Sequence, residues 1–249
     1  MTDMVDLDAA YFEFGPERKG RWLITCDHAT NRVPAEINGG DLGIPAQDMN
    51  RHIAYDIGAE AVALLLGQLL DSPVLASNFS RLVIDPNRGE DDPTLVMKLY
   101  DGTIIPGNRH VDDAERERRL NAYHRPYHRA YAELVQGRAI LAIHSFTPQL
   151  RGRPPRPWEI GVLFAQDTRL SDQVIAGLRG QGDITVGSNE PYNGHLPGDS
   201  VDRHGLRDGR PNALIELRND LVADETGQKY WAERLAPIVR AALMQIQGT

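Results

Sequence analysis

The segment AILAIHS, residues 139–145, begins with five apolar residues and ends in a histidine and a serine. A short apolar run of this kind is typical of a strand that is buried on both faces of a parallel sheet. Two other runs share the pattern, because residues 22–26 (WLITC) lie just before His28, and residues 213–217 (ALIEL) contain Glu216. Three buried strands are therefore expected to carry two histidines and a glutamate at or near their carboxyl ends.

Segments with helical spacing separate these runs. Residues 53–70, 170–179 and 224–246 place apolar side chains at helical intervals. Residues 112–136 form a charged amphipathic segment, which Pro126 is expected to kink. Strands that alternate with helices predict a mainly parallel sheet covered on both faces.

The rest of the chain adds short strands and two long polar stretches. Strands are expected at residues 73–77, 82–85 and 160–165. Residues 86–110 and 187–211 are predicted to be long surface loops, and loops of this length in compact domains are often functional. In open α/β sheets the ligand lies outside the carboxyl ends of the strands, where such loops begin.

The composition is that of an ordinary globular protein and limits the possible ligands. The chain has 249 residues, 41% of them apolar, and a formal net charge of -8. We expect one domain over residues 1–249. Arginines are scattered and acids outnumber bases, so a nucleic-acid ligand is not expected. An acidic small molecule remains possible if arginines gather at one place.

Two further features favour a cytoplasmic protein without membrane contact. Cys26 is the single cysteine, so no intrachain disulfide can form, and its apolar surroundings predict a buried, inert thiol. The acidic N-terminus does not resemble a signal peptide, and the apolar stretch at residues 61–70 is too short to cross a bilayer.

His28, His144 and Glu216 together suggest metal-assisted hydrolysis. A single histidine at a strand end is more often a structural residue, but two histidines and a strand glutamate favour a metal site. A catalytic zinc usually takes three protein ligands and a water molecule, which becomes a nucleophile near neutral pH. Glu216 stands among apolar neighbours, so burial is expected to raise its pKa into the range of a general base.

The third ligand is open among Asn31, Asp56 and Asp27, the last of which adjoins His28. Asn31 lies three residues after His28, and Asp56 lies near the start of the first long helix. Carboxylate oxygen suits zinc better than amide oxygen, which favours Asp56. The alternative for Asp56 is an acid in the first helical turn that complements the helix dipole.

Two arginines flank the expected strand at residues 82–85. Arg81 precedes it, and Arg88 follows it beside Asn87. Guanidinium groups bind carboxylates through two parallel hydrogen bonds, so this cluster suits a substrate with one or two carboxylates. The alternative is that one arginine pairs with Asp85 or with the acidic residues that follow.

The other histidines give weaker signals. His124 and His128 are four residues apart and share a helical face with several tyrosines, which indicates mainly aromatic packing. Asn189 and His204 lie in the second long loop and are candidates for the pocket wall. His52 is expected to be solvated.

Six segments in order resemble the N-formylglutamate amidohydrolase family. They are CDHATNRVP (26–34), HIAYDIGA (52–59), SRLVIDPNR (80–88), RPYHRAY (125–131), IHSFTP (143–148) and IELRND (215–220). The ordered set covers about residues 20–220. The family is distantly similar to zinc carboxypeptidases and to deacylases such as succinylglutamate desuccinylase and aspartoacylase.

The resemblance implies a fold and a metal site. The fold would be a three-layer α/β/α arrangement of the zinc-carboxypeptidase type, with a mixed, mostly parallel sheet. His28 matches the first ligand of a divalent metal, expected to be Zn²⁺, and His144 matches the last. The glutamate of the HxxE motif in the related enzymes is Asn31 here, so either Asn31 coordinates weakly or a residue such as Asp56 replaces it.

The resemblance also implies roles for the polar residues. Asn87 and Arg88 match an Asn-Arg pair that binds the substrate carboxylate, Arg81 adds an oxyanion contact, and Glu216 matches the general base. The implied reaction converts N-formyl-L-glutamate, or a similar N-acyl amino acid, to formate and glutamate, in histidine degradation. The alternatives are a deacylase or carboxypeptidase acting on another N-acyl amino acid or small peptide, and a non-catalytic carboxylate-binding relative, which the missing HxxE glutamate favours.

Overall fold

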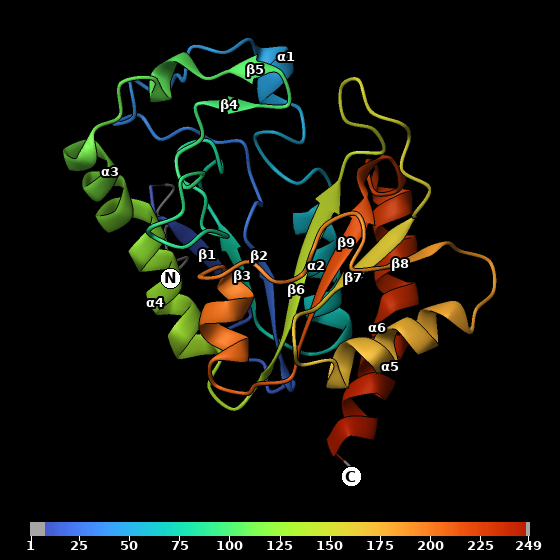
Figure 1. The fold of residues 1–249 in the computed structure, drawn as a ribbon. Coiled ribbons are helices and arrows are strands. Elements are labelled where there is room, and N and C mark those ends of the chain that lie inside the picture. The colour runs from blue at the N-terminus through green and yellow to red at the C-terminus, as the bar shows by residue number, and fades with distance from the viewer. Residues whose placement is uncertain (1–7, 248–249) are drawn as a thin grey trace.

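A seven-stranded sheet forms the centre of the molecule in a computed structural model that describes residues 8–247 (Figure 1). The strand order is β1-β3-β2-β6-β9-β7-β8. The strands are β1 (Tyr11–Phe14), β2 (Trp22–Cys26), β3 (Val74–Ser77), β6 (Ala139–Phe146), β7 (Ile160–Leu163), β8 (Val186–Ser188) and β9 (Asn212–Arg218). A separate hairpin pairs β4 (Leu99–Tyr100) with β5 (Thr103–Ile104).

Six α-helices and four shorter helical segments surround the sheet in the described residues. The α-helices are α1 (Ala46–Met49), α2 (Ala59–Leu69), α3 (Asp113–Arg119), α4 (Arg125–Leu134), α5 (Arg169–Arg179) and α6 (Glu225–Gln247). Two 3₁₀ segments are η1 (Pro106–Asn108) and η4 (Asn219–Leu221), and two π-helical segments are η2 (Leu120–His124) and η3 (Asp202–Leu206). None of the helices described is long and apolar enough to cross a membrane.

The sheet is mixed and mostly parallel, as predicted. Strands β3, β2, β6 and β9 run parallel to one another, and β8 runs parallel to β7. Strand β1 is antiparallel to β3, and β7 is antiparallel to β9. The carboxyl ends of four neighbouring strands therefore meet at one edge of the sheet.

Helices cover both faces, which confirms the three-layer arrangement. Side chains of α2, α5 and α6 pack against Leu141 and Ile143 of β6 on one face, and Tyr127 and Tyr131 of α4 pack near Ile140 on the other (Figure 1). Successive side chains of a strand point to opposite faces. His144 and Glu216 therefore share the α4 face with Ile140, Ala142 and Leu214.

Most predicted elements are confirmed, with shifted ends. The expected helix at residues 53–70 begins only at Ala59, because Gly58 adopts a left-handed φ of 78°. A side chain at Gly58 would lie 2.0 Å from the carbonyl oxygen of Val222, so this close approach requires glycine. The prediction that Cys26 is a buried thiol is also confirmed.

The strand predicted at residues 82–85 is wrong. These residues are buried, but they form turns in which Leu82 N donates to Ser80 Oγ and Asp85 N donates to the carbonyl of Leu95. Burial arises here because the segment packs into a second apolar cluster beneath loops, and no strand pairing is needed to satisfy its backbone. An apolar run therefore indicated burial correctly and secondary structure incorrectly.

Two long segments differ in detail from what the sequence indicates. Residues 86–110 contain the β4–β5 hairpin and several buried side chains, so they are only partly a surface loop. Residues 112–136 form α3 and α4 joined by the π-helical turn η2. Pro126 lies in the first turn of α4, directly after this π-helical turn, and the helix continues through it, so the proline does not split the segment.

Candidate active site

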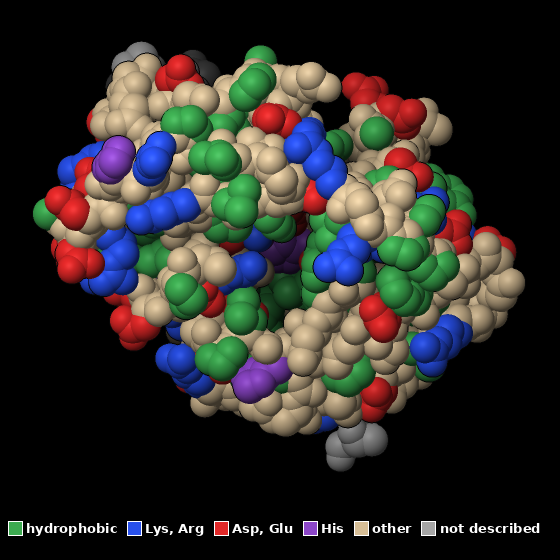
Figure 2. All heavy atoms as spheres, turned by 45° about the horizontal axis from the view of Figure 1, so that its top comes forward, with side chains coloured by type: hydrophobic (Ala, Val, Ile, Leu, Met, Phe, Trp, Pro, Cys, Tyr) green, Lys and Arg blue, Asp and Glu red, His purple; other side chains and the backbone are tan. Residues whose placement is uncertain are grey.

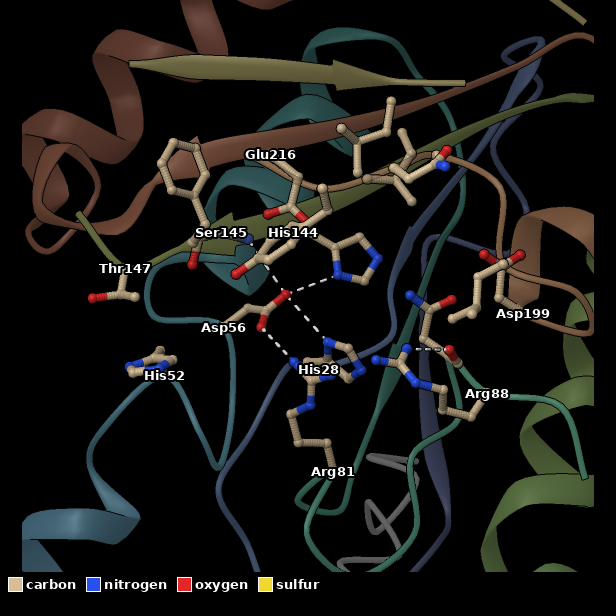
Figure 3. A pocket seen from close by; sticks show the side chains of 18 of the residues that line it. His28, His52, Asp56, Arg81, Arg88, His144, Ser145, Thr147, Asp199 and Glu216 are labelled. Atoms are coloured by element: carbon tan, nitrogen blue, oxygen red, sulfur yellow. Dashed lines mark hydrogen bonds and ion pairs between the residues drawn. The ribbon is translucent and has the colours of Figure 1, made fainter. Parts of the chain in front are cut away.

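A cavity of about 250 Å³ opens at the carboxyl ends of the parallel strands. Figure 2 shows its mouth as a hollow with histidine side chains at the base. Seven of the residues singled out in the sequence line this cavity: His28, Asp56, Arg81, Asn87, Arg88, His144 and Glu216. The long-range topology thus gathers residues from all parts of the sequence into one pocket (Figure 3).

Two histidines and an aspartate meet at the base of the pocket. Asp56 Oδ2 lies 3.2 Å from His28 Nδ1 and 2.8 Å from His144 Nδ1 (Figure 3). The backbone fixes this arrangement, since Asp56 N donates to the carbonyl of His28 and Ser145 Oγ donates to the carbonyl of Ile57. All three side chains are buried, and their candidate ligand atoms lie within 4.8 Å of one another.

Each histidine has a second buried carboxylate at its other ring nitrogen. His28 Nε2 lies 2.7 Å from Asp85 Oδ1, and His144 Nε2 lies 3.3 Å from Asp27 Oδ2. Asp27 in turn accepts a 2.5 Å hydrogen bond from the hydroxyl of Tyr127. Both ring nitrogens of each histidine therefore face carboxylates, which only accept, so a cation bound at Nδ1 would leave the ring proton on Nε2, toward Asp85 or Asp27.

The buried charges around the histidines fit a divalent cation. In the part of the chain that the structure describes, three buried carboxylates, those of Asp27, Asp56 and Asp85, lie around the two histidines, together with the guanidinium of Arg81, which is close to Asp56 and Asp85. With neutral imidazoles the group would lack two positive charges, and the environment favours positive charge: burial would lower the pKa of His144, but Asp27 and Asp56 hold that pKa well above its ordinary value. Two imidazole nitrogens and one carboxylate oxygen form the donor set of a catalytic zinc site, with a fourth position left for water.

Glu216 lies beside this group in the next strand. Its backbone is in register with His144, and its side chain lines the pocket. The Oε2 atom is buried and has no hydrogen-bond partner among residues 8–247. Burial, and to a smaller extent the nearby carboxylate of Asp56, raises the pKa of Glu216 to about 7. A carboxyl with this pKa can both take and return a proton near neutral pH.

Arg81 is held by the carboxylates at the base. Its Nε and Nη2 atoms donate to Asp85 Oδ2 at 3.1 and 2.8 Å, and Nη1 lies 3.6 Å from Asp56 Oδ1. Burial by itself would raise the pKa of Asp85, but Arg81 and His28 hold it well below its ordinary value. The alternative that one arginine pairs with Asp85 therefore holds for Arg81.

Asn87 and Arg88 present unused donors on another wall of the pocket. Asn87 Oδ1 accepts from Ser200 N at 3.2 Å. Arg88 Nε donates to Thr94 Oγ1, and Arg88 Nη1 donates to the backbone carbonyl of Asn87. Within the described residues, Asn87 Nδ2 and Arg88 Nη2 have no protein acceptor, so both can donate to a bound carboxylate.

The structure does not bring Asn31 to His28, Asp56 and His144, which form the candidate metal-binding group. Its side-chain amide donates to the carbonyl of Met49 at 2.9 Å and to Asn50 Oδ1 at 3.0 Å. Of the residues considered for the third position, Asp56 lies in the group and Asn31 lies outside it, while Asp27 faces the Nε2 atom of His144. The reason is the sharp turn before α2, which returns Asp56 to the end of β2.

Asn189 and His204 are not among the residues that line the pocket. Asn189 Oδ1 accepts from Phe164 N at 2.8 Å, with the residue in a left-handed conformation at φ 53°. His204 Nε2 instead lies 2.9 Å from His128 Nδ1, behind the pocket wall. Their loop does reach the pocket, but through other residues.

The expectation of a solvated His52 is wrong. Its side chain is buried and lines the pocket, because Tyr100 and Asp101 of the β4–β5 hairpin cover it. Burial lowers the pKa of His52 to about 4, so its imidazole is neutral near pH 7. The hairpin that covers it could not be recognised from the loop-like composition of residues 86–110.

The remaining wall residues lie in strands and in loops, and none was singled out from the sequence. They are Tyr100, Ser145, Phe146, Thr147, Leu163, Tyr192, Asn193, Gly194, His195, Leu196, Asp199 and Leu214. Among them, Asp199 is buried, and burial raises its pKa to about 6. Only the length of the two loop segments indicated that they contribute to the pocket.

Fold and side-chain arrangement together define an α/β protein with a candidate metal site formed by His28, Asp56 and His144. A family model described as N-formylglutamate amidohydrolase matches residues 20–223, and the chain belongs to this family. The resemblance inferred from the six sequence segments is therefore confirmed.

Relatives and solved structures agree with this assignment. N-formylglutamate deformylases of Pseudomonas putida and Pseudomonas aeruginosa are each 26% identical over 251 residues, covering 90% of both chains. The crystal structure of a gene product from Agrobacterium tumefaciens has a TM-score of 0.91 and 36% identity over 98% of both chains. An N-formylglutamate amidohydrolase from Ralstonia eutropha shares the fold, with a TM-score of 0.67 and 24% identity over 97% of this chain and 100% of that one.

Replacement of Asp27 by asparagine is expected to weaken metal binding. The carboxylate that faces His144 Nε2 would become a neutral amide, and loss of such a partner typically lowers metal affinity by about 10–100-fold. Zinc affinity would be measured by competition with a chelator, with exposed Asp91→Asn as the control. Equal affinities of Asp27→Asn and the unmodified protein would show that Asp27 does not support the site.

Proposed function

We propose that this protein hydrolyses the amide bond of N-formyl-L-glutamate and releases formate and glutamate, or hydrolyses an N-acyl amino acid of similar shape to the corresponding carboxylic acid and amino acid. The observation that carries the proposal is the convergence of His28, Asp56 and His144 beside Glu216 in a pocket that also contains Arg88. The family assignment and the names of the deformylase relatives support the same reaction.

His28 Nδ1, His144 Nδ1 and a carboxylate oxygen of Asp56 would hold a divalent ion, with Zn²⁺ as the first choice. When bound, such an ion polarises the acyl carbonyl and lowers the pKa of a water molecule. Asp85 and Asp27 orient the two imidazoles from behind. Zinc is preferred over other divalent ions because two imidazoles and one carboxylate match its usual catalytic ligands.

Glu216 would transfer the proton in this reaction. As a carboxylate it takes a proton from the attacking water, and as a carboxylic acid it delivers that proton to the leaving nitrogen. Its unpartnered Oε2 and its pKa of about 7 suit both steps. Arg81 faces the pocket with Nη1 and would stabilise negative charge on the former carbonyl oxygen.

Arg88 and Asn87 would bind the substrate carboxylate. Arg88 Nη2 and Asn87 Nδ2 provide donors for the two oxygens of one carboxylate group. Binding at this end would place the amide bond near the metal-binding group and hold it in a reactive orientation. A cytoplasmic location and a role in histidine degradation stay predictions.

The direct test is hydrolysis by the purified protein with and without a chelator. The substrates would be N-formyl-L-glutamate, N-acetyl-L-glutamate, N-succinyl-L-glutamate and small peptides that end in glutamate. We expect formate release from the first substrate, loss of activity with the chelator, and recovery when Zn²⁺ is added. Preference for another substrate would indicate a different deacylase or carboxypeptidase, and no turnover by zinc-loaded protein would indicate a carboxylate-binding protein without catalysis.

Glu216→Gln is expected to lower kcat by about 100-fold or more and to leave KM nearly unchanged, because the amide keeps the shape and loses the proton transfer. Steady-state kinetics with N-formyl-L-glutamate would measure both constants. Exposed Glu225→Gln is the matched control. Turnover of Glu216→Gln at the rate of the control would remove Glu216 from the mechanism.

Arg88→Ala is expected to raise KM for N-formyl-L-glutamate by about 10–100-fold, with a smaller effect on kcat, because a charge-assisted contact to the substrate is lost. Exposed Arg153→Ala, in a surface loop, serves as the control. An unchanged KM in Arg88→Ala would place the carboxylate site elsewhere in the pocket.

A further inference from the structure

Three histidines outside the metal-binding group form a second buried cluster. His124 belongs to the π-helical segment η2, His128 to α4 and His204 to the π-helical segment η3. The rings of His124 and His128 have centroids 4.4 Å apart, and those of His128 and His204 are stacked at 5.2 Å. The predicted aromatic packing of this helical face is present, since the His204 ring also stacks on Tyr131 at 4.2 Å.

The cluster also makes hydrogen bonds, which packing alone does not require. His128 Nε2 lies 3.0 Å from the carbonyl oxygen of Pro86, and His124 Nε2 lies 3.0 Å from that of Arg88. A carbonyl oxygen only accepts, so both Nε2 atoms must carry protons. In its neutral form, His128 then accepts at Nδ1 from His204 Nε2, which lies 2.9 Å away. The proton positions of the three rings follow from their partners.

The neutral state of the cluster agrees with its surroundings. Burial lowers the pKa of His124, of His128 and of His204, the last to about 4. Their Nε2 atoms are already used as donors, so the cluster is not arranged to bind a metal ion through them. It is arranged to hold backbone carbonyl groups.

The carbonyls that the cluster holds belong to the turn at residues 86–88. Pro86 O also accepts from Ser200 Oγ at 3.3 Å, and Asn87 O accepts from Arg88 Nη1 at 2.7 Å. All three carbonyl groups of the turn therefore have side-chain donors. The same turn carries Asn87 and Arg88, whose free donors face the pocket.

Ser200 connects the turn to the segment that carries His204. Its backbone N–H donates to Asn87 Oδ1, which turns the amide nitrogen of Asn87 away from Ser200. Ser200 lies two residues before η3, which begins at Asp202. Both sides of the turn are thus fixed, by η2 and α4 on one side and by the approach to η3 on the other.

We propose that His124, His128 and His204 are positioning residues that hold the 86–88 turn so that Asn87 and Arg88 can bind the substrate carboxylate. The inference rests on the proposed function and identifies what sets the geometry of its carboxylate site. The three histidines act through the turn and do not contact the substrate. Their loss should therefore weaken substrate binding more than it slows the chemical step.

The test compares His124→Leu with His124→Gln. Glutamine can keep an N–H near the carbonyl of Arg88, whereas leucine cannot. We expect His124→Leu to raise KM for N-formyl-L-glutamate about tenfold with kcat within about threefold, and His124→Gln to stay near the unmodified protein. The same comparison would be repeated in Arg88→Ala, where removal of the His124 donor should have little further effect because its target is already lost.

Thermal unfolding and exposed His110→Leu provide the controls. If His124→Leu does not fold, His128→Asn replaces it, because asparagine can accept from His204 but cannot reach Pro86 O. The proposal would be overturned if His124→Leu left KM unchanged, or if His124→Gln and His124→Leu changed KM equally. It would also be overturned if His124→Leu changed KM as strongly in the Arg88→Ala protein as in the unmodified one. If the unmodified protein hydrolyses nothing, the proposed function fails separately, and calorimetric binding of N-formyl-L-glutamate to the same variants decides the inference by the same criteria.

Discussion

The carboxylate of Asp85 joins the two ends of the candidate active site. Its Oδ1 atom accepts from His28 Nε2 at 2.7 Å and from Asn87 N at 2.9 Å, while Oδ2 accepts from Arg81. A buried carboxylate is stable only when its oxygens are paired in this way. Asp85 therefore fixes both the orientation of His28 and the start of the turn at residues 86–88.

The fold brings these residues together through a few geometric constraints. Four parallel strands end at the same edge of the sheet, and the alternation of side chains places His144 and Glu216 on the same face. The turn around Gly58 brings Asp56 back to the end of β2. The result is a buried group of carboxylates and imidazoles whose ligand atoms lie close enough together to hold a divalent cation.

The sequence allowed correct predictions where local patterns determine the outcome. The apolar runs that contain or precede His28, His144 and Glu216 are central strands, and parallel pairing then requires their polar ends to lie together. The family was also identifiable, because six short segments occur in one order. These predictions depend on periodicity and order, which a single sequence displays.

The errors have a common physical cause in contacts that are distant in the chain. The run at residues 82–85 is buried by loops, His52 is covered by a hairpin, and His204 turns away from the pocket toward α4. The choice between Asn31 and Asp56 depended on one turn whose path the sequence did not reveal. Local composition can at best predict that such residues are buried. Which element covers them is determined by the tertiary structure.

The most direct measurement is anomalous diffraction at the zinc absorption edge from crystals of the zinc-loaded protein. The central claim predicts one strong peak about 2.0–2.2 Å from His28 Nδ1, His144 Nδ1 and an oxygen of Asp56. A peak at the cluster of His124, His128 and His204, or no peak between His28 and His144, would contradict it.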